Sequence, residues 1–133
     1  MTEAQLRRIL PEYPGVSEAP SYGTPGWRVR KKLLARIHQS EPAVVLHVGS
    51  IDAQETLIAA EPEMFYVTDH YEGHPWVLAR LSKLRAPRLR EIAEAAWRRA
   101  ASRKQIAELD EGTGASRSAP RSGRSRAPGR ARG

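Results

Sequence analysis

A short polar segment, residues 69–75 (DHYEGHP), carries the side chains of this chain that are best suited to chemistry. It places the carboxylate of Asp69 close in sequence to the imidazoles of His70 and His74, and such groups serve in metal sites and in acid–base catalysis. However, the glycine and proline of this segment disfavour the helix that would put both histidines on one face, and the spacing matches no metal-binding or catalytic motif. The sequence therefore predicts no metal site and no catalytic residue here. Instead, we expect Asp69 and Thr68 to hydrogen-bond the loop backbone.

A second polar segment, residues 22–25 (YGTP), is a candidate partner for this loop. Its glycine permits close approach of the backbone, and its hydroxyl groups could line a cleft. Together the two segments suggest a candidate ligand cleft formed by Tyr22, Thr24, Asp69, His70 and Trp76. The chain contains no glycine-rich phosphate loop with a lysine, no serine elbow and no dinucleotide-binding motif. Accordingly, neither catalysis nor a cofactor is expected.

Two strands must hold the loop of residues 69–75 in place. Apolar and polar residues alternate with a period of two over residues 65–68, and β-branched and aromatic residues resume over residues 76–81. This pattern is typical of paired strands. We therefore predict a central hairpin whose turn is residues 69–75. A further strand is predicted over residues 43–49, where alternate valine and leucine residues share a face.

A first hairpin is predicted from residues 27–30 and 33–37, with Lys31 and Lys32 as its turn. Alternation along the second of these strands places Leu33 and Ala35 on one face. The hairpin gathers the densest basic patch in the folded part of the chain: Arg28, Arg30, Lys31, Lys32 and Arg36. One interpretation is a solvated hairpin whose charges prevent pairing with other sheet edges. The other is a surface that contacts phosphates.

Helices are indicated where apolar residues recur at spacings of three and four behind a capping residue or a proline. Thr2 with Gln5 forms a capping box, Asp52 with Glu55 forms a second, and Ser102 is expected to cap the last helix. The strongest stripe, from Leu89 to Ala100, predicts a buried helix face. The predicted helices are residues 3–10, 52–61, 87–100 and 103–109.

Composition limits the chain to one modest domain. It has 133 residues, of which 40% are apolar, and this is enough for a single core. The absence of cysteine excludes disulfides and thiolate chemistry and fits a reducing compartment. No apolar run approaches the roughly 20 residues that a membrane-spanning helix needs. We therefore expect a cytoplasmic protein that does not associate with membranes; a monomer is favoured, although the sequence does not determine the oligomeric state.

The net charge of +7 is unevenly distributed along the chain. Residues 1–111 contain all 15 acidic residues and 16 of the 22 basic ones, so this part carries a charge of only +1. Residues 112–133 consist of Gly, Ser, Ala, Pro, Thr and Arg alone, which predicts a disordered tail behind a folded domain of residues 1–111. The basic residues of this tail are Arg117, Arg121, Arg124, Arg126, Arg130 and Arg132.

Several motifs resemble those of the MmcQ/YjbR family of small bacterial proteins. They are PGV at residues 14–16, YGTP at residues 22–25, the arginine- and lysine-rich pattern of residues 28–35 and, above all, VTDHYxGHPWVLxRL at residues 67–81. The similarity covers roughly residues 6–109. It implies a CyaY-like (frataxin-like) α+β fold, a two-layer sandwich in which helices pack on one face of an antiparallel sheet.

The resemblance also implies DNA binding by a double wing of strand hairpins. Accordingly, we expect the basic hairpin and the arginine-rich tail to contact phosphates without sequence preference. Lys31 and Lys32 stand where members of this family often have glycine, so the tip of the wing differs here. Iron handling is not supported, because the first predicted helix has Arg7 and Arg8 beside Glu3 where iron-handling relatives of this fold are acidic. The alternative function is a small-molecule-binding or enzymatic domain built on the candidate cleft.

Overall fold

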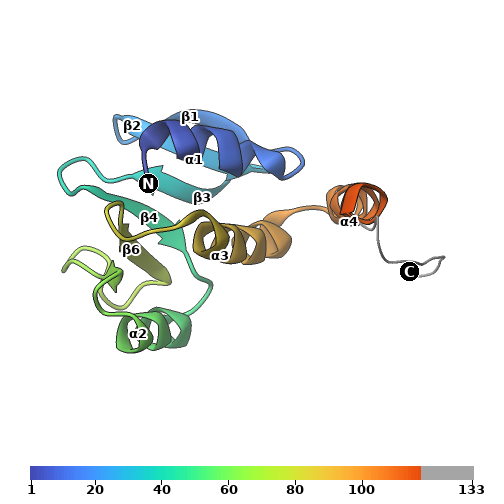
Figure 1. Cartoon of the computed structure of the whole chain (residues 1–133). Helices are drawn as coiled ribbons and strands as arrows, with labels where there is room; N and C mark the ends of the chain where they lie inside the picture. Colours follow the sequence, from blue (N-terminus) through green and yellow to red (C-terminus); the bar gives the residue numbers. More distant parts are fainter. Residues whose placement is uncertain (118–133) are drawn as a thin grey trace. The chain divides into compact units, whose positions relative to one another are not determined.

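The computed structural model describes residues 1–117 (Figure 1). The chain divides into two units, Met1–Ala101 and the part from Ser102 onward, and each is described by itself. The first unit contains α1 (Glu3–Ile9), the 3₁₀ helix η1 (Leu10–Glu12), β1 (Ser17–Ser21), β2 (Thr24–Val29), β3 (Lys32–Ile37), β4 (Ala43–His47), α2 (Ile51–Ala60), β5 (Phe65–Tyr66), β6 (Trp76–Arg80) and α3 (Ala86–Ala100). The strands form one antiparallel sheet in the order β1-β2-β3-β4-β6-β5. The predicted α+β class is confirmed.

One face of the sheet is the main hydrophobic core. The strand register places Trp27, Ala35, Leu46 and Val77 in a row across β2, β3, β4 and β6, and each is at most 1% exposed. The predicted apolar stripe of α3 is buried over its whole length, and α3 contacts β3 and β4. Burial of these side chains is the main stabilising term of the fold.

The segment that follows the N-terminal helix contacts α3. The capping box of Thr2 and Gln5 starts α1 as predicted. After η1, the Tyr13 hydroxyl donates to the carbonyl oxygen of Arg90, and the indole Nε1 of Trp97 donates to that of Pro14 over 2.8 Å. The two helices therefore cover the same face of the sheet, in agreement with the predicted arrangement of helices on one face.

The opposite face of the sheet carries a second, smaller cluster. Here the register aligns Arg36, Val45, Leu78 and Tyr66 across β3, β4, β6 and β5. The loop of residues 67–75 folds over this face and inserts the ring of Tyr71, which is 8% exposed, against Val45 and Leu78. This face is covered by a loop instead of a helix, and it holds the candidate site.

The first hairpin differs from the prediction in its turn and in its register. Its turn is Arg30 and Lys31, both with positive φ (52° and 71°), and Lys32 already belongs to β3. Two successive left-handed residues suit the twist of a tight two-residue hairpin turn. Arg30 and Lys31 both have this conformation, whereas Lys32 does not. A bulge between the pairs Trp27–Ala35 and Arg28–Leu33 puts Leu33 and Ala35 on opposite faces, so the predicted strict alternation of this strand was wrong.

Two other elements were not predicted correctly. Strand β1 was missed; it pairs with β2 through a turn at Tyr22 and Gly23. Helix α2 begins one residue earlier than expected, because Ser50 accepts from the backbone N–H of Ala53 and acts as the cap in place of Asp52. By contrast, the central hairpin of β5 and β6 is confirmed.

The second unit contains helix α4 (Arg103–Arg117). Ser102 caps it as expected, accepting from the backbone N–H of Gln105. The helix continues beyond the predicted end at Leu109, so its last residues fall within the stretch expected to be a disordered tail. The remainder of that tail, with Arg121, Arg124, Arg126, Arg130 and Arg132, lies outside the described residues. Within residues 1–117, no helix is both long and apolar enough to span a bilayer.

Candidate functional site

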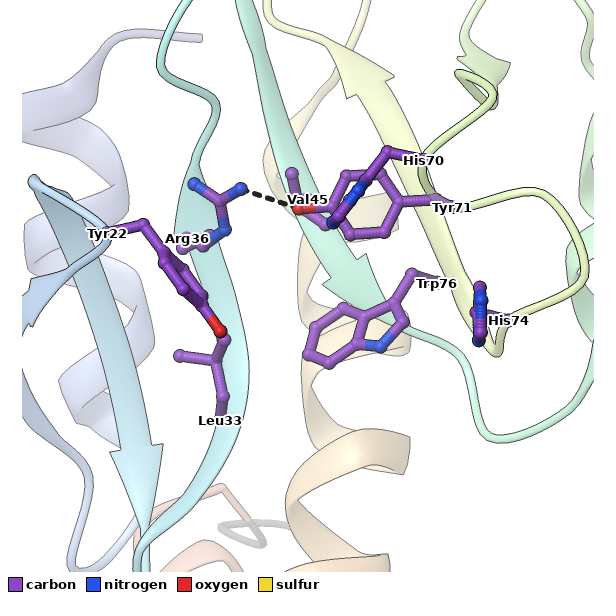
Figure 2. Close-up of a pocket in the computed structure, with 8 residues that line it drawn as sticks. All are labelled: Tyr22, Leu33, Arg36, Val45, His70, Tyr71, His74 and Trp76. Carbon is purple, nitrogen blue, oxygen red and sulfur yellow. Dashed lines mark hydrogen bonds between the residues drawn. The ribbon is translucent and has the colours of Figure 1, made fainter.

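A pocket of about 330 Å³ opens on the face of the sheet that faces away from α1 and α3 (Figure 2). Its lining comes from the β1–β2 turn, from β3 and β4, and from the loop and start of β6, so segments far apart in sequence meet here. No carboxylate is among the side chains that line it. The lining residues are Tyr22, Leu33, Arg36, Val45, His70, Tyr71, His74 and Trp76.

Arg36 brings a buried positive charge to the pocket. It is 4% exposed, and its Nη atoms donate to neutral oxygens of Thr24, Ile37, Gln39 and Tyr71 at 2.6–3.3 Å. Its Nε atom has no hydrogen-bond partner, and no carboxylate forms an ion pair with it, among the residues that the structure describes. A buried charge is costly unless it is paired, so the lack of a carboxylate partner in this part of the chain makes Arg36 the main candidate for contact with an anion.

Tyr71 supplies a hydrogen-bond donor beside this charge. Its hydroxyl oxygen accepts from Nη2 of Arg36 over 2.6 Å, so the hydroxyl proton is left to donate elsewhere. A donor polarised by a neighbouring cation forms a stronger hydrogen bond. The ring of His70 lies edge-on to that of Tyr71, with the centroids 4.7 Å apart. Arg36 and Tyr71 therefore place a positive charge and a hydroxyl proton side by side at the pocket.

Gln54 of α2 fixes the loop that carries Tyr71. Its side chain is 3% exposed, and its Nε2 atom lies within hydrogen-bond distance of the carbonyl oxygens of Tyr71 (3.2 Å), His74 (2.7 Å) and Trp76 (2.7 Å). A buried amide that serves several carbonyls replaces the regular strand pairing which this loop lacks. The wall of the pocket is thus held by one side chain from a distant helix.

Tyr22 and Trp76 line the pocket from opposite sides (Figure 2). The ring of Tyr22 is 86% exposed and lies against the guanidinium of Arg36, whose Cζ is 5.3 Å from the ring centroid. Trp76 is half-buried and packs edge-on against His47, with the centroids 4.7 Å apart. The pocket therefore has aromatic walls around a single cation.

The pocket joins three of the five residues of the candidate cleft. Tyr22, His70 and Trp76 line it, and Thr24 lies behind it, where its hydroxyl oxygen accepts from Arg36 over 3.3 Å. Asp69 is exposed and is not part of the lining.

The loop is not shaped, as had been expected, by hydrogen bonds from the side chains of Asp69 and Thr68 to its backbone. The carbonyl oxygen of Thr68 accepts from the backbone N–H groups of Tyr71 and Glu72. The hydroxyl oxygen of Thr68 is buried and has no hydrogen-bond partner among residues 1–117. The loop is instead closed by hydrogen bonds between its own backbone groups and by the side chain of Gln54.

The five basic residues of the first hairpin do not lie in one exposed patch. Arg36 is buried at the pocket, whereas Arg30, Lys31 and Lys32 are exposed at the hairpin tip. Arg30 also donates to the carbonyl oxygen of Ala100, and Arg28, which is half-buried, donates to the hydroxyl of Ser21. Arg117 ends α4 in the other unit. The structure therefore separates the charge of Arg36 from the charges that face solvent.

The residues that the sequence did not assign to the cleft are Leu33, Arg36, Val45, Tyr71, His74 and Gln54. Tyr71 lies between the two histidines of the polar loop, and its residue type alone does not distinguish a buried tyrosine from an exposed one. For Arg36 a signal was present: a charged residue in a strand of otherwise apolar neighbours is a candidate for burial at a site. Gln54 had no such signal, since its partners are backbone carbonyls.

The described residues contain no group of three or more histidine, aspartate or glutamate side chains that could hold a metal ion. His70 and His74 both line the pocket, although no helix joins them. Neither imidazole has a hydrogen-bond partner within the described part of the chain, so nothing there fixes its tautomer for acid–base chemistry.

Comparisons with known proteins agree with this architecture. Curated relatives are uncharacterised proteins of Mycobacterium bovis and of two strains of Mycobacterium tuberculosis, each 32% identical over 53% of this chain and 68% of the relative. The crystal structure of protein DR2400 of Deinococcus radiodurans, with a DUF419 domain, is similar in fold; its TM-score is 0.63 at 20% identity, covering 82% of this chain and 88% of the other. The family model YjbR matches residues 12–99, which include every residue of the pocket. This chain belongs to the YjbR family.

Proposed function

We propose that this protein binds a small molecule that carries a carboxylate, in the pocket beside Arg36. The observation that carries the proposal is the buried guanidinium, which meets only neutral oxygens among the described residues. An anion placed against Arg36 and Tyr71 would pair this charge and accept the free hydroxyl proton. Charge-assisted hydrogen bonds of this kind are about twice as strong as neutral ones.

A monoanion suits the pocket better than a phosphate does. One guanidinium lines it, accompanied by the hydroxyl of Tyr71 as a neutral donor. A phosphate dianion is usually bound by several cations or by backbone N–H groups at a helix N-terminus, and no helix end is in this lining. The volume of about 330 Å³ is at the lower end of the roughly 300–1,000 Å³ of ligand sites, so the ligand is small.

The position of the pocket also supports a functional role. Residues 22–25 and 67–81, the two motifs that most clearly indicated the family, lie far apart in sequence, and both contribute side chains to it. The role proposed is binding without catalysis. Within residues 1–117, neither imidazole has a hydrogen-bond partner that would orient it as acid or base.

Titration of the isotope-labelled protein tests this function, with benzoate and its neutral isostere benzamide as probes. The indole N–H of Trp76 is the reporter, because Trp27 and Trp97 are fully buried. We expect benzoate to shift this signal and to bind at least tenfold more tightly than benzamide, as a charged hydrogen bond of about 1.5–3 kcal/mol implies. Equal dissociation constants for the two probes would refute anion binding at this site.

A second candidate function is nucleic-acid binding by the tip of the β2–β3 hairpin. The specific observation is that Arg28, Arg30, Lys31 and Lys32 form no ion pair with a carboxylate within the described residues. By contrast, four arginines of the helices are paired with glutamates: Arg7, Arg88, Arg90 and Arg98. Unpaired cations are the ones that can release counterions from a phosphate backbone. In this proposal Arg36 takes no part, because it is buried.

The tail arginines would add sequence-independent attraction to DNA. If Arg117, Arg121, Arg124, Arg126, Arg130 and Arg132 all met duplex phosphates, the slope of log affinity against log salt would steepen by up to about five units, since each contact contributes roughly 0.9. A salt series with the full chain and with a variant in which all six are glutamine measures this. Indistinguishable slopes would exclude a role of the tail, and no binding by either chain at low salt would exclude this candidate function.

A further inference from the structure

Tyr22 occupies a turn position that suits other residue types. It is the first residue of the two-residue turn between β1 and β2, and its φ is +54°. Turns with two left-handed residues favour asparagine, aspartate and glycine, and a left-handed conformation costs an ordinary residue about 1–2 kcal/mol. The backbone therefore gives no reason for an aromatic residue here.

Burial does not explain this tyrosine either. Its side chain is 86% exposed, one of the two large hydrophobic residues that are exposed in the described part of the chain. Its ring lies 5.3 Å, centroid to Cζ, from the guanidinium of Arg36, and such exposed cation–π contacts are weak. What the ring does provide is one wall of the pocket.

The opposite wall is also aromatic. Figure 2 shows Trp76 and Tyr71 across the pocket from Tyr22, with the hydrogen bond between Arg36 and Tyr71 at one end of the space between them. Leu33 and Val45 complete the lining with apolar surface. The arrangement is thus a slot with aromatic sides and an anion-binding end.

We infer that the ligand is an aromatic monocarboxylate: a flat ring that lies between Tyr22 and Trp76, with its carboxylate at Arg36 and Tyr71. This inference rests on the proposed function and adds the identity of the group that the walls contact. Flat rings gain from stacked and edge-on contacts with aromatic side chains beyond the area they bury. Tyr22 is the side of the pocket that selects a flat ring, since the bound ring would cover its exposed side chain.

Four probes separate this inference from the proposed function: benzoate, benzamide, cyclohexanecarboxylate and cyclohexanecarboxamide, titrated into the full chain with the Trp76 indole N–H as reporter. The carboxylate against the amide of each ring tests the anion site. Comparison of the flat with the puckered ring, at the same headgroup, tests the aromatic slot. We expect benzoate to bind about fivefold more tightly than cyclohexanecarboxylate, as aromatic contacts of about 0.5–1.5 kcal/mol correspond to a factor of roughly 2 to 12. Equal affinities for the two rings would overturn the inference, even if both carboxylates bound more tightly than their amides.

Two variants of Tyr22 locate the selectivity. Tyr22→Gly removes the ring at a position whose positive φ glycine accepts, so folding is preserved. In this variant the preference for the flat ring should fall to less than twofold. Tyr22→Phe keeps the ring and should retain the wild-type ratio. If Tyr22→Gly kept the fivefold ratio, or if Tyr22→Phe lost it, the assignment of Tyr22 as the selective wall would be wrong.

Discussion

The guanidinium of Arg36 donates a 2.6 Å hydrogen bond to the hydroxyl oxygen of Tyr71, and this contact joins β3 to the loop of residues 67–75. Arg36 is in a central strand of the sheet and Tyr71 is in a turn, yet both are buried. The pair leaves one positive charge without a carboxylate in the described part of the chain and one hydroxyl proton without an acceptor. The guanidinium and the hydroxyl group both lie at the same pocket. A bound carboxylate would pair the charge and accept the proton.

The hydroxyl of Tyr71 can be removed without changing the ring. In Tyr71→Phe the pocket keeps its wall but loses the donor, so we expect the dissociation constant for benzoate to rise about tenfold, equivalent to about 1.4 kcal/mol. The matched control is Tyr66→Phe, which removes a hydroxyl that donates to Glu41 on the same face of the sheet. It should leave the dissociation constant unchanged. An equal effect of the two variants would mean that Tyr71 acts only through stability.

Gln54 is expected to be the main support of the loop. Gln54→Leu removes the side-chain donor that the carbonyl oxygens of Tyr71, His74 and Trp76 share, although those of Tyr71 and His74 still accept from a backbone N–H group. We expect the free energy of unfolding to fall by about 1–3 kcal/mol, because buried carbonyl oxygens lose hydrogen bonds and the loop loses its link to α2. Urea denaturation measures this. Glu55→Leu, at an exposed neighbouring position of α2, should change the value by less than about 0.5 kcal/mol. A loss below that level in Gln54→Leu would contradict the role assigned to this side chain.

Two substitutions of Lys31, in the turn of the first hairpin, distinguish the effect of backbone strain from the effect of its charge. Its φ of +71° disfavours lysine, so Lys31→Gly should raise the free energy of unfolding by about 0.5–1 kcal/mol, whereas Lys31→Ala keeps the strain and should not. Both variants remove the charge. If the hairpin tip binds DNA, the two should therefore reduce the salt slope equally, by about one unit each. A slope that followed stability instead of charge would contradict nucleic-acid binding by the tip.

His47 should make stability depend on pH. Burial, followed by the charges of Arg99 and Lys32, lowers its pKa below the ordinary value of 6.5. The folded protein then binds fewer protons than the unfolded chain, so this contribution to stability is fully present above pH 6.5 and is lost as the pH falls toward the folded-state pKa. NMR titration of the His47 ring should give a pKa below 6.5, and His47→Gln should flatten the pH dependence of unfolding. A pKa at or above 6.5 would contradict the burial described here.

Elements that depend on local sequence were predictable. The apolar stripe of α3, the capping box of Thr2 and Gln5, and the hairpin of β5 and β6 all follow from periodicity and side-chain chemistry within a few residues. Strand β1 was not, because four of its five residues are exposed and it contains Pro20, so it shows no alternation. The bulge in β3 was missed because it depends on the pairing of two strands.

The site was only partly predictable for a related reason. Tyr22, His70 and Trp76 were identified because unusual residue types cluster around them in sequence. Burial of Arg36 depends on a loop that arrives from elsewhere in the chain, and the support by Gln54 is a contact between a helix and backbone carbonyls. Neither leaves a pattern in its own segment. Tertiary contacts thus turned an expected surface cation into the centre of a pocket.

Removal of the Arg36 charge tests the central claim most directly. The measurement is the dissociation constant for benzoate in the wild type, in Arg36→Lys and in Arg36→Gln, with folding verified by the dispersion of the amide spectrum. We predict that Arg36→Gln weakens binding at least tenfold and that Arg36→Lys, which keeps the charge but loses the planar fork, has an intermediate value. A folded Arg36→Gln variant that binds benzoate as tightly as the wild type would contradict the account.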